Sequence, residues 1–113
     1  MRQMADIRLT PNLSRALEEL RRRLLAEFDV EAVILYGSVA RGEADDESDQ
    51  DVLIVTTQPI TRPERDRITD AAFEVNLLYG TNISTLVVAR DTWETGAAVC
   101  LLRDAILEDG ILL

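Results

Sequence analysis

Two short apolar runs constrain the fold of this 113-residue chain more than any other feature. The first covers residues 32–36 (Ala-Val-Ile-Leu-Tyr) and ends at Gly37, and the second covers residues 52–55 (Val-Leu-Ile-Val). Short apolar runs bounded by glycine or polar residues are typical of strands that are buried on both faces. We therefore expect two buried strands, with polar residues placed directly after the first and directly before the second.

Helical periodicity dominates much of the remaining chain. Residues 11–28 follow the helix-start pair Thr10-Pro11, a second helix is expected from Pro63 to about residue 79, and a third over about 97–108. Gly80 and Gly110 end the latter two. The apolar positions expected to be buried on these helices are Leu13, Ala16, Leu17, Leu20, Leu24, Phe28, Ile68, Ala71, Ala72, Val75, Tyr79, Leu101, Leu102, Ala105 and Ile106.

The order of elements predicts the fold class. Residues 83–88 suit a third strand, and residues 38–41 can form one helical turn before Gly42. The order is then helix, strand, short helix, strand, helix, strand, helix. It predicts a single α/β or α+β domain over residues 1–113, with three or four strands and helices around them. The pattern leaves the relative direction of the strands open.

Missing residue types exclude several chemistries. The chain has no histidine, all twelve of its basic residues are arginine, and Cys100 is its only cysteine. These absences exclude histidine-centred triads, the usual zinc sites, a P-loop lysine, Schiff-base catalysis and an internal disulfide. Carboxylates, hydroxyls, arginines and backbone dipoles remain, and these groups suit magnesium-assisted phosphoryl transfer.

The charge is concentrated in one segment. The net charge is −9, and residues 43–51 hold six acids and no base, so the remainder, with 15 acids and 12 arginines, carries only −3. This charge argues against direct binding to duplex nucleic acid. An acidic run alone also fits a solvated loop. No apolar run is long enough to span a membrane and the first residues lack a signal peptide, so we expect a cytoplasmic protein.

Asp49 and Asp51 are candidate magnesium ligands. They lie two residues apart, immediately before the second buried run. If the strand begins there, both side chains leave the same face, with Cα atoms roughly 6–7 Å apart. Such a pair can bind one or two Mg²⁺ ions, whose remaining ligands are phosphate and water. The alternative is that Asp49 and Asp51 are two ordinary surface aspartates that bind no metal.

Gly37, Ser38 and Arg41 are candidate phosphate-binding residues. Glycine at a strand end lets the backbone approach a ligand, and the following N–H groups and the Ser38 hydroxyl can donate to an anion. Arg41, one turn later, can pair with phosphate oxygens. A Gly-Ser pair after a strand is also a common turn.

At a fixed spacing these pieces resemble a known family. The segments Leu35-Tyr36-Gly37-Ser38-Val39-Ala40-Arg41-Gly42 and Ser48-Asp49-Gln50-Asp51-Val52-Leu53-Ile54-Val55 are similar to the minimal nucleotidyltransferases of the DNA polymerase beta superfamily. Their signature is Gly-Ser, ten residues, then Asp-x-Asp. The resemblance implies the nucleotidyltransferase fold, a mixed sheet flanked by helices. It also implies transfer of a nucleoside monophosphate with release of pyrophosphate, with Asp49 and Asp51 as catalytic metal ligands and Gly37, Ser38 and Arg41 at the nucleotide.

The chain departs from that family in two respects. A third acid is usual on the next core strand, but residues 82–88 contain none, and Asp70, Glu74 and Asp91 lie elsewhere. The second departure is that we expect no extra domain for the acceptor within these 113 residues, which suggests that a partner brings the substrate. Small proteins of this family are often encoded beside a HEPN-type ribonuclease toxin, and some transfer AMP to a tyrosine of it.

Two hypotheses of different class follow. The first is a Mg-dependent nucleotidyltransferase that transfers AMP from ATP to a partner protein such as a HEPN-type toxin. The alternative is a binding module with the same fold and a degenerate site, which acts by contact alone. A glycosyltransferase that uses the Asp-x-Asp pair is a third reading. Trp93 can be a partner anchor or a core residue, and the oligomeric state, a homo-oligomer included, stays open.

Overall fold

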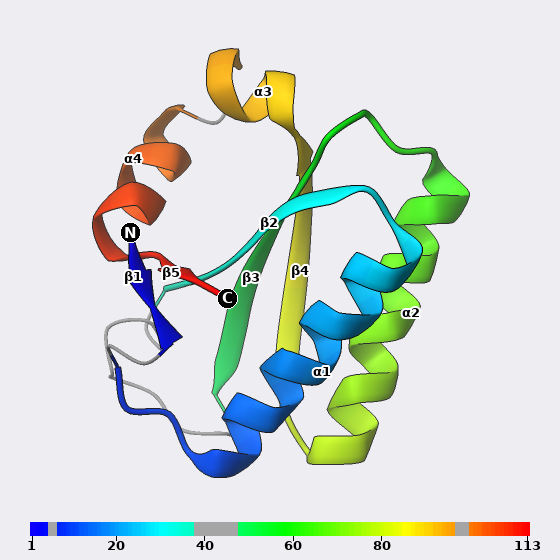
Figure 1. The fold of residues 1–113 in the computed structure, drawn as a ribbon, viewed down its shortest axis with the longest axis vertical. Coiled ribbons are helices and arrows are strands. Elements are labelled where there is room, and N and C mark those ends of the chain that lie inside the picture. Colours follow the sequence, from blue (N-terminus) through cyan, green and yellow to red (C-terminus); the bar gives the residue numbers. More distant parts are fainter. Residues whose placement is uncertain (5–6, 38–47, 97–99) are drawn as a thin grey trace.

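A mixed five-stranded sheet with helices on both faces forms the protein in the computed structural model (Figure 1). The structure describes residues 1–4, 7–37, 48–96 and 100–113. Its elements in chain order are β1 (Arg2–Gln3), α1 (Pro11–Glu27), β2 (Val30–Tyr36), β3 (Asp49–Thr56), α2 (Arg62–Tyr79), β4 (Asn82–Ala89), α3 (Arg90–Thr95), α4 (Cys100–Asp109) and β5 (Ile111–Leu112). None of the helices in these ranges combines the length and apolarity needed to cross a bilayer.

The strand order is β1-β5-β2-β3-β4. β2 is antiparallel to β3 and to β5, whereas β3 is parallel to β4 and β1 to β5. The chain reverses between β2 and β3, so the end of β2 lies beside the start of β3. The crossover through α2 then places the start of β4 at the same edge of the sheet (Figure 1). The three strand ends that carry the candidate residues therefore meet at one place.

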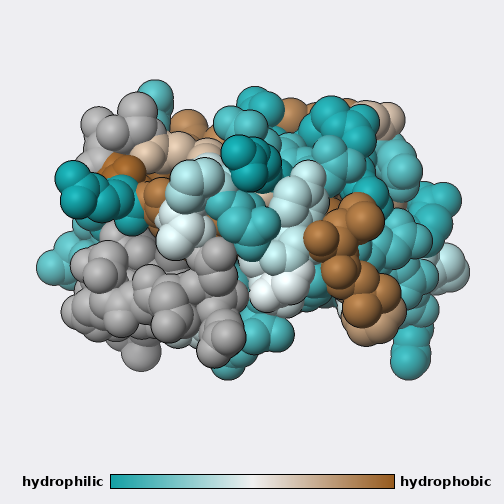
Figure 2. Space-filling view, turned by 90° about the horizontal axis from the view of Figure 1, so that it is seen from below, coloured by the Kyte–Doolittle hydropathy of each residue, from teal (hydrophilic) through white to brown (hydrophobic). Residues whose placement is uncertain are grey.

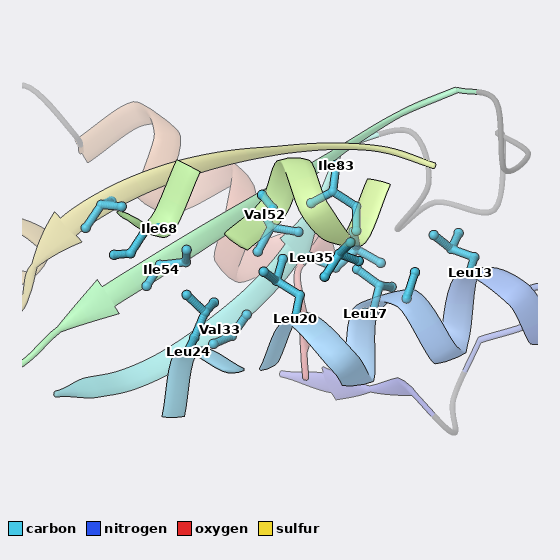
Figure 3. Packing of buried hydrophobic residues seen from close by; sticks show 14 of the residues in the cluster. Leu13, Leu17, Leu20, Leu24, Val33, Leu35, Val52, Ile54, Ile68 and Ile83 are labelled. Atoms are coloured by element: carbon cyan, nitrogen blue, oxygen red, sulfur yellow. The ribbon is translucent and has the colours of Figure 1, made fainter. Parts of the chain in front are cut away.

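α1 and α2 cover one face of the sheet. Thr10 caps α1, its side chain accepting a hydrogen bond from the Leu13 amide at 3.1 Å, and the helix buries its leucine stripe completely. Figure 3 shows this stripe against alternate residues of β2 and β3. The residues of this larger hydrophobic cluster that Figure 3 labels are Leu13, Leu17, Leu20, Leu24, Val33, Leu35, Val52, Ile54, Ile68 and Ile83. Burial of this face is the main stabilising contribution, at roughly 25 cal/mol per Å² of apolar surface.

A smaller cluster covers the opposite face. Ile34, Leu53, Val55 and Val88 alternate with the residues above and pack against Ile106 of α4. Trp93 and Leu102 are half-buried against the same cluster. This position favours the core reading of Trp93.

Side chains of α2 protect the free edge of β4. Asn76 accepts from the Ile83 amide at 2.8 Å and donates to the Ile83 carbonyl at 3.0 Å, as a neighbouring strand would. Arg65 donates to the Val87 carbonyl at 3.4 Å. An edge strand with unpaired backbone N–H and C=O groups can pair with another chain, and these side-chain contacts satisfy some of those groups in β4.

The sequence-based expectations are mostly confirmed. The mixed sheet flanked by helices is present, α1 and α2 begin and end within a residue of expectation, and Gly80 ends α2 with a φ of +67°. The expected count of three or four strands is wrong, because β1 and β5 were missed; with two residues each, they are too short to show alternation. The short helix α3 was also missed.

Other expectations fail or lie outside the description. Ala105 was expected to be buried on the last helix, but its side chain is exposed. The side chain of Leu101 and the expected turn over residues 38–41 lie outside the described residues. The start expected for the last helix, over residues 97–99, lies outside them too.

Candidate active site

Asp49 and Asp51 lie at the start of β3, on one face of the sheet. Asp49 is the first residue of the strand and is exposed, whereas Asp51 is half-buried. They alternate with Gln50 and share a face with Leu53 and Val55, which belong to the smaller cluster. The condition on which the metal-ligand expectation depended, that the strand begin at these residues, is therefore met.

Gly37 lies against the carboxylate of Asp51. Tyr36, the last residue of β2, is the register partner of Asp51, and Gly37 follows it with a φ of +83°, a conformation that favours glycine. A Cβ atom built on Gly37 would stand 2.9 Å from Oδ2 of Asp51. The carboxylate thus occupies the space that a side chain at position 37 would need. Ser38 and Arg41, the other two expected phosphate contacts, lie outside the described residues.

The electrostatics of the pair favour a positive ligand. Partial burial, and then the negative charge of Asp49, raise the pKa of Asp51 above its usual value of 3.8. Burial, and then the charge of Asp51, likewise raise the pKa of the Tyr36 hydroxyl. Both shifts indicate that negative charge at Asp51 is poorly compensated by the described residues. A cation between the two carboxylates would relieve this, and carboxylate oxygens are the ligands that Mg²⁺ prefers.

Ser84 of β4 stands next to Asp51 where a third acid would be useful. The parallel register pairs Asp51 with Ser84 and Asp49 with Asn82, so these side chains share a face. Ser84 is exposed, while Thr85 pairs with Val52 and belongs to the other face. Among the described residues, no three acids lie close enough together to hold a metal ion.

The three acids considered for the missing position lie elsewhere. Asp70 and Glu74 are on α2, on the opposite face of the sheet, where they line a groove with Arg23 and Arg67. Glu74 pairs there with Arg23 at 2.7 Å. Asp91 is the second residue of α3 and lies beyond the far end of β4, a strand about 23 Å long at roughly 3.3 Å per residue. None of the three can complete this site without a large rearrangement.

Gln50, which no sequence motif marks as a site residue, is fully buried and lies between the two aspartates in the chain, on the opposite face of β3. Its side-chain oxygen accepts from the Asn82 amide at 3.2 Å, and its side-chain nitrogen donates to the Ser48 carbonyl. The sequence does contain a signal for Gln50. Alternation along the strand places this polar residue on the same face as the apolar Val52 and Ile54, so its burial could have been expected.

Comparison with known proteins identifies the family. The model of the family described as nucleotidyltransferase domain matches residues 13–113, which is most of the chain. The chain belongs to this family. The nucleotidyltransferase domain is also 41% identical over 58 residues to a protein of Methanocaldococcus jannaschii (strain ATCC 43067) that is provisionally named a protein adenylyltransferase. That match covers 51% of the chain and 59% of the relative, so it spans little more than half of the relative's length.

Solved structures agree on the fold of this nucleotidyltransferase domain. A structure provisionally named a minimal nucleotidyltransferase has a TM-score of 0.58 and 28% identity, with 89% of this chain and 93% of that chain covered. A toxin–antitoxin crystal structure with AMP-PNP has a TM-score of 0.60 at 13% identity, covering 87% of this chain and 69% of that chain. The toxin–antitoxin MntA-HpeT structure has a TM-score of 0.57 at 16% identity, covering 89% and 70%. The last two show the fold alone.

Proposed function

We propose that this nucleotidyltransferase domain transfers AMP from ATP to a hydroxyl group of a partner protein in the cytoplasm. In this proposal Asp49 and Asp51 hold Mg²⁺, and Gly37, Ser38 and Arg41 bind the triphosphate. Mg²⁺ supplies neutralisation of phosphate charge as it develops. The acceptor oxygen forms a bond to the α-phosphorus, the bond from that phosphorus to the bridging oxygen breaks, pyrophosphate leaves, and the acceptor proton passes to solvent.

One observation carries the proposal: the carboxylate of Asp51 fills the space above Gly37, on the face that also carries Asp49. A phosphate that approaches the backbone at Gly37 would therefore lie close to a metal held by Asp51. The raised pKa of Asp51 supports the same reading, because carboxyl groups whose pKa is perturbed by burial and a second carboxyl are frequent at functional sites.

A protein acceptor is supported by the relatives. One relative is provisionally named a protein adenylyltransferase, and two structures with the same fold are toxin–antitoxin assemblies, one of them with AMP-PNP. We propose a HEPN-type toxin as the partner, with a tyrosine as the acceptor. The net charge of −9 fits a basic, nucleic-acid-binding partner better than duplex nucleic acid itself.

The second candidate function is a binding module that neutralises a toxin by contact alone. It is favoured by Ser84, a residue without charge, at the position next to Asp51. A single Mg²⁺ would still fit the Asp49–Asp51 pair, whereas a second ion would lack a ligand from β4. This candidate predicts nucleotide binding, at most, without turnover.

The test is transfer of label from α-phosphate-labelled ATP to the protein encoded by the neighbouring gene. We expect label on that partner with the unmodified domain and none with Asp51→Asn. Asp70→Asn is the matched control, since Asp70 is an exposed acid on the opposite face and should leave transfer unchanged. Toxin neutralisation without any label, in the presence of Mg²⁺ and ATP, would instead support the binding module.

A further inference from the structure

Gln50 separates the two candidate metal ligands but points away from them. Its side chain is 0% exposed, on the face of β3 that packs against α1 and α2. The next residues on that face are Val52 and Ile54, both fully buried and apolar. Burying an amide among them costs free energy unless hydrogen bonds replace those it made with water.

Two hydrogen bonds connect this amide to the backbone around Asp49. The Asn82 amide donates to Oε1 at 3.2 Å. Asn82 is the first residue of β4 and the register partner of Asp49. The Ser48 carbonyl, which accepts from Nε2, belongs to the residue before β3 begins. One side chain therefore ties the start of β3 both to β4 and to the segment that enters β3.

We propose that Gln50 is a positioning residue, which holds the backbone of Asp49 and Asp51 so that both carboxylates face one ligand. This inference rests on the proposed function of that pair. The first residues of a strand open more easily than its middle, and Asp49 is the first residue of β3. Because the direction of a strand side chain follows its backbone, bonds on one face restrain the carboxylates on the other.

The need to position the two carboxylates accurately gives a reason for a buried polar residue at position 50. Binding and catalytic groups work when held to within about 0.5 Å, and Mg²⁺ accepts little deviation in ligand geometry. An apolar residue at position 50 would continue the apolar face of Val52 and Ile54 without any desolvation cost. It would leave the Asn82 amide and the Ser48 carbonyl without these two bonds, and so leave Asp49 less restrained.

Thr56 offers a matched control for the test. It lies on the same face of the same strand, is 1% exposed, and donates a side-chain hydrogen bond to the Gln58 carbonyl at 2.7 Å. It differs from Gln50 in lying at the far end of β3. We compare Gln50→Met, which keeps the length of the side chain and removes both bonds, with Thr56→Val.

Two readouts decide the matter. The first is amide hydrogen exchange in the nucleotide-free protein, where Gln50→Met should speed exchange at Asn82 and at residues 49–51 by about tenfold. The second is transfer of AMP from labelled ATP to the partner, where kcat should fall by about ten- to a hundredfold and KM for ATP should rise, because the same two carboxylates bind Mg-ATP. Thr56→Val should change neither readout.

Faster exchange with unchanged kcat would overturn the proposal, as would an equal loss of kcat in Thr56→Val. If Gln50→Met does not fold, Asn82→Pro removes the same bond from the donor side, and Asn82→Ala is its control. The proline variant should fold, because proline is tolerated at the first residue of a strand. It lacks the N–H that donates to Gln50, whereas the alanine variant keeps it, so only the proline variant should lose kcat. Equal kcat in the two variants would overturn the proposal. If the unmodified domain transfers nothing, the proposed function fails, and hydrogen exchange at residues 49–51 then decides alone whether Gln50 restrains the pair.

Discussion

Replacing Gly37 by alanine tests the contact between this glycine and Asp51. Two effects are expected. The φ of +83° is strained for any residue with a Cβ, and the new Cβ would stand 2.9 Å from Oδ2 of Asp51, where ordinary contact begins at 3.4 Å. The first effect is a backbone cost, and the second displaces a proposed metal ligand.

The structure separates the two effects in magnitude. A left-handed conformation costs a non-glycine residue about 1–2 kcal/mol, partly offset by the lower entropy of the unfolded alanine chain. Gly80 has a φ of +67° and nothing within 4 Å of its added Cβ, so Gly80→Ala carries the backbone cost alone. Oδ2 can retreat by the missing 0.5 Å through rotation of a flexible side chain, at a further cost of about 0.5–1.5 kcal/mol. We expect free energies of unfolding lower by about 1 kcal/mol for Gly80→Ala and about 1.5–2.5 kcal/mol for Gly37→Ala.

Binding should distinguish the variants far more clearly than stability does. Displacing a carboxylate ligand by half an ångström should reduce the affinity for Mg-ATP by about ten- to a hundredfold, a range typical of disturbed ligand positioning. Gly80→Ala should bind as the unmodified domain does. Urea denaturation measures the stabilities, and calorimetry measures the binding. Wild-type affinity in Gly37→Ala, with the stability loss intact, would refute the assignment of Asp51 as a metal ligand.

Three further predictions concern neighbouring residues. Asp51→Asn should stabilise the nucleotide-free protein in urea denaturation by about 1 kcal/mol at pH 7, since two charges about 6.6 Å apart repel by about 0.6 kcal/mol in water and about 2.5 at an effective dielectric of 20. The gain should vanish as the pH falls through the raised pKa of Asp51, because the protonated acid is neutral too, and a gain that persists at low pH would contradict this cause. Asn76→Ala should cost about 2–3 kcal/mol by the same assay, since it frees both backbone groups of Ile83, while the exposed Thr69→Ala should cost less than about 0.5; equal losses would refute this account of the β4 edge. Ser84→Asp should raise the rate of AMP transfer to the partner if the missing acid limits turnover. If the unmodified domain already transfers AMP quickly and Ser84→Asp does not change its rate, the missing acid is not limiting.

Most of the fold could be predicted because its signals are long and periodic. The helix from Pro11 shows its leucine stripe from Leu13 to Leu24, about three turns, and β2 and β3 appear as apolar runs. β1 and β5 are two residues long, and their pairing depends on contacts between the two ends of the chain, which no local pattern can reveal. Ala105 lies in an apolar segment of the sequence, yet the orientation of α4 on the sheet leaves it exposed.

The candidate site could be predicted in residue type but not in arrangement. Spacing alone placed Asp49 and Asp51 on one face, because alternation along a strand is a local property. The contact of Asp51 with Gly37 depends on the antiparallel register of β2 and β3, which sequence patterns leave open. The same holds for Ser84, since the parallel register of β3 and β4 decides which residue stands beside Asp51.

The most direct test of the account is calorimetric titration of Mg-ATP into the unmodified domain, Asp51→Asn and Asp70→Asn. Both variants remove one acid, but Asp51 lies against Gly37 and Asp70 lies on the opposite face. We expect the unmodified domain and Asp70→Asn to bind with equal affinity, and Asp51→Asn to lose at least about tenfold, as a charge-assisted contact worth about 1.5–3 kcal/mol requires. Equal affinity in all three proteins would contradict the claim that Asp49 and Asp51 form a nucleotide-binding metal site.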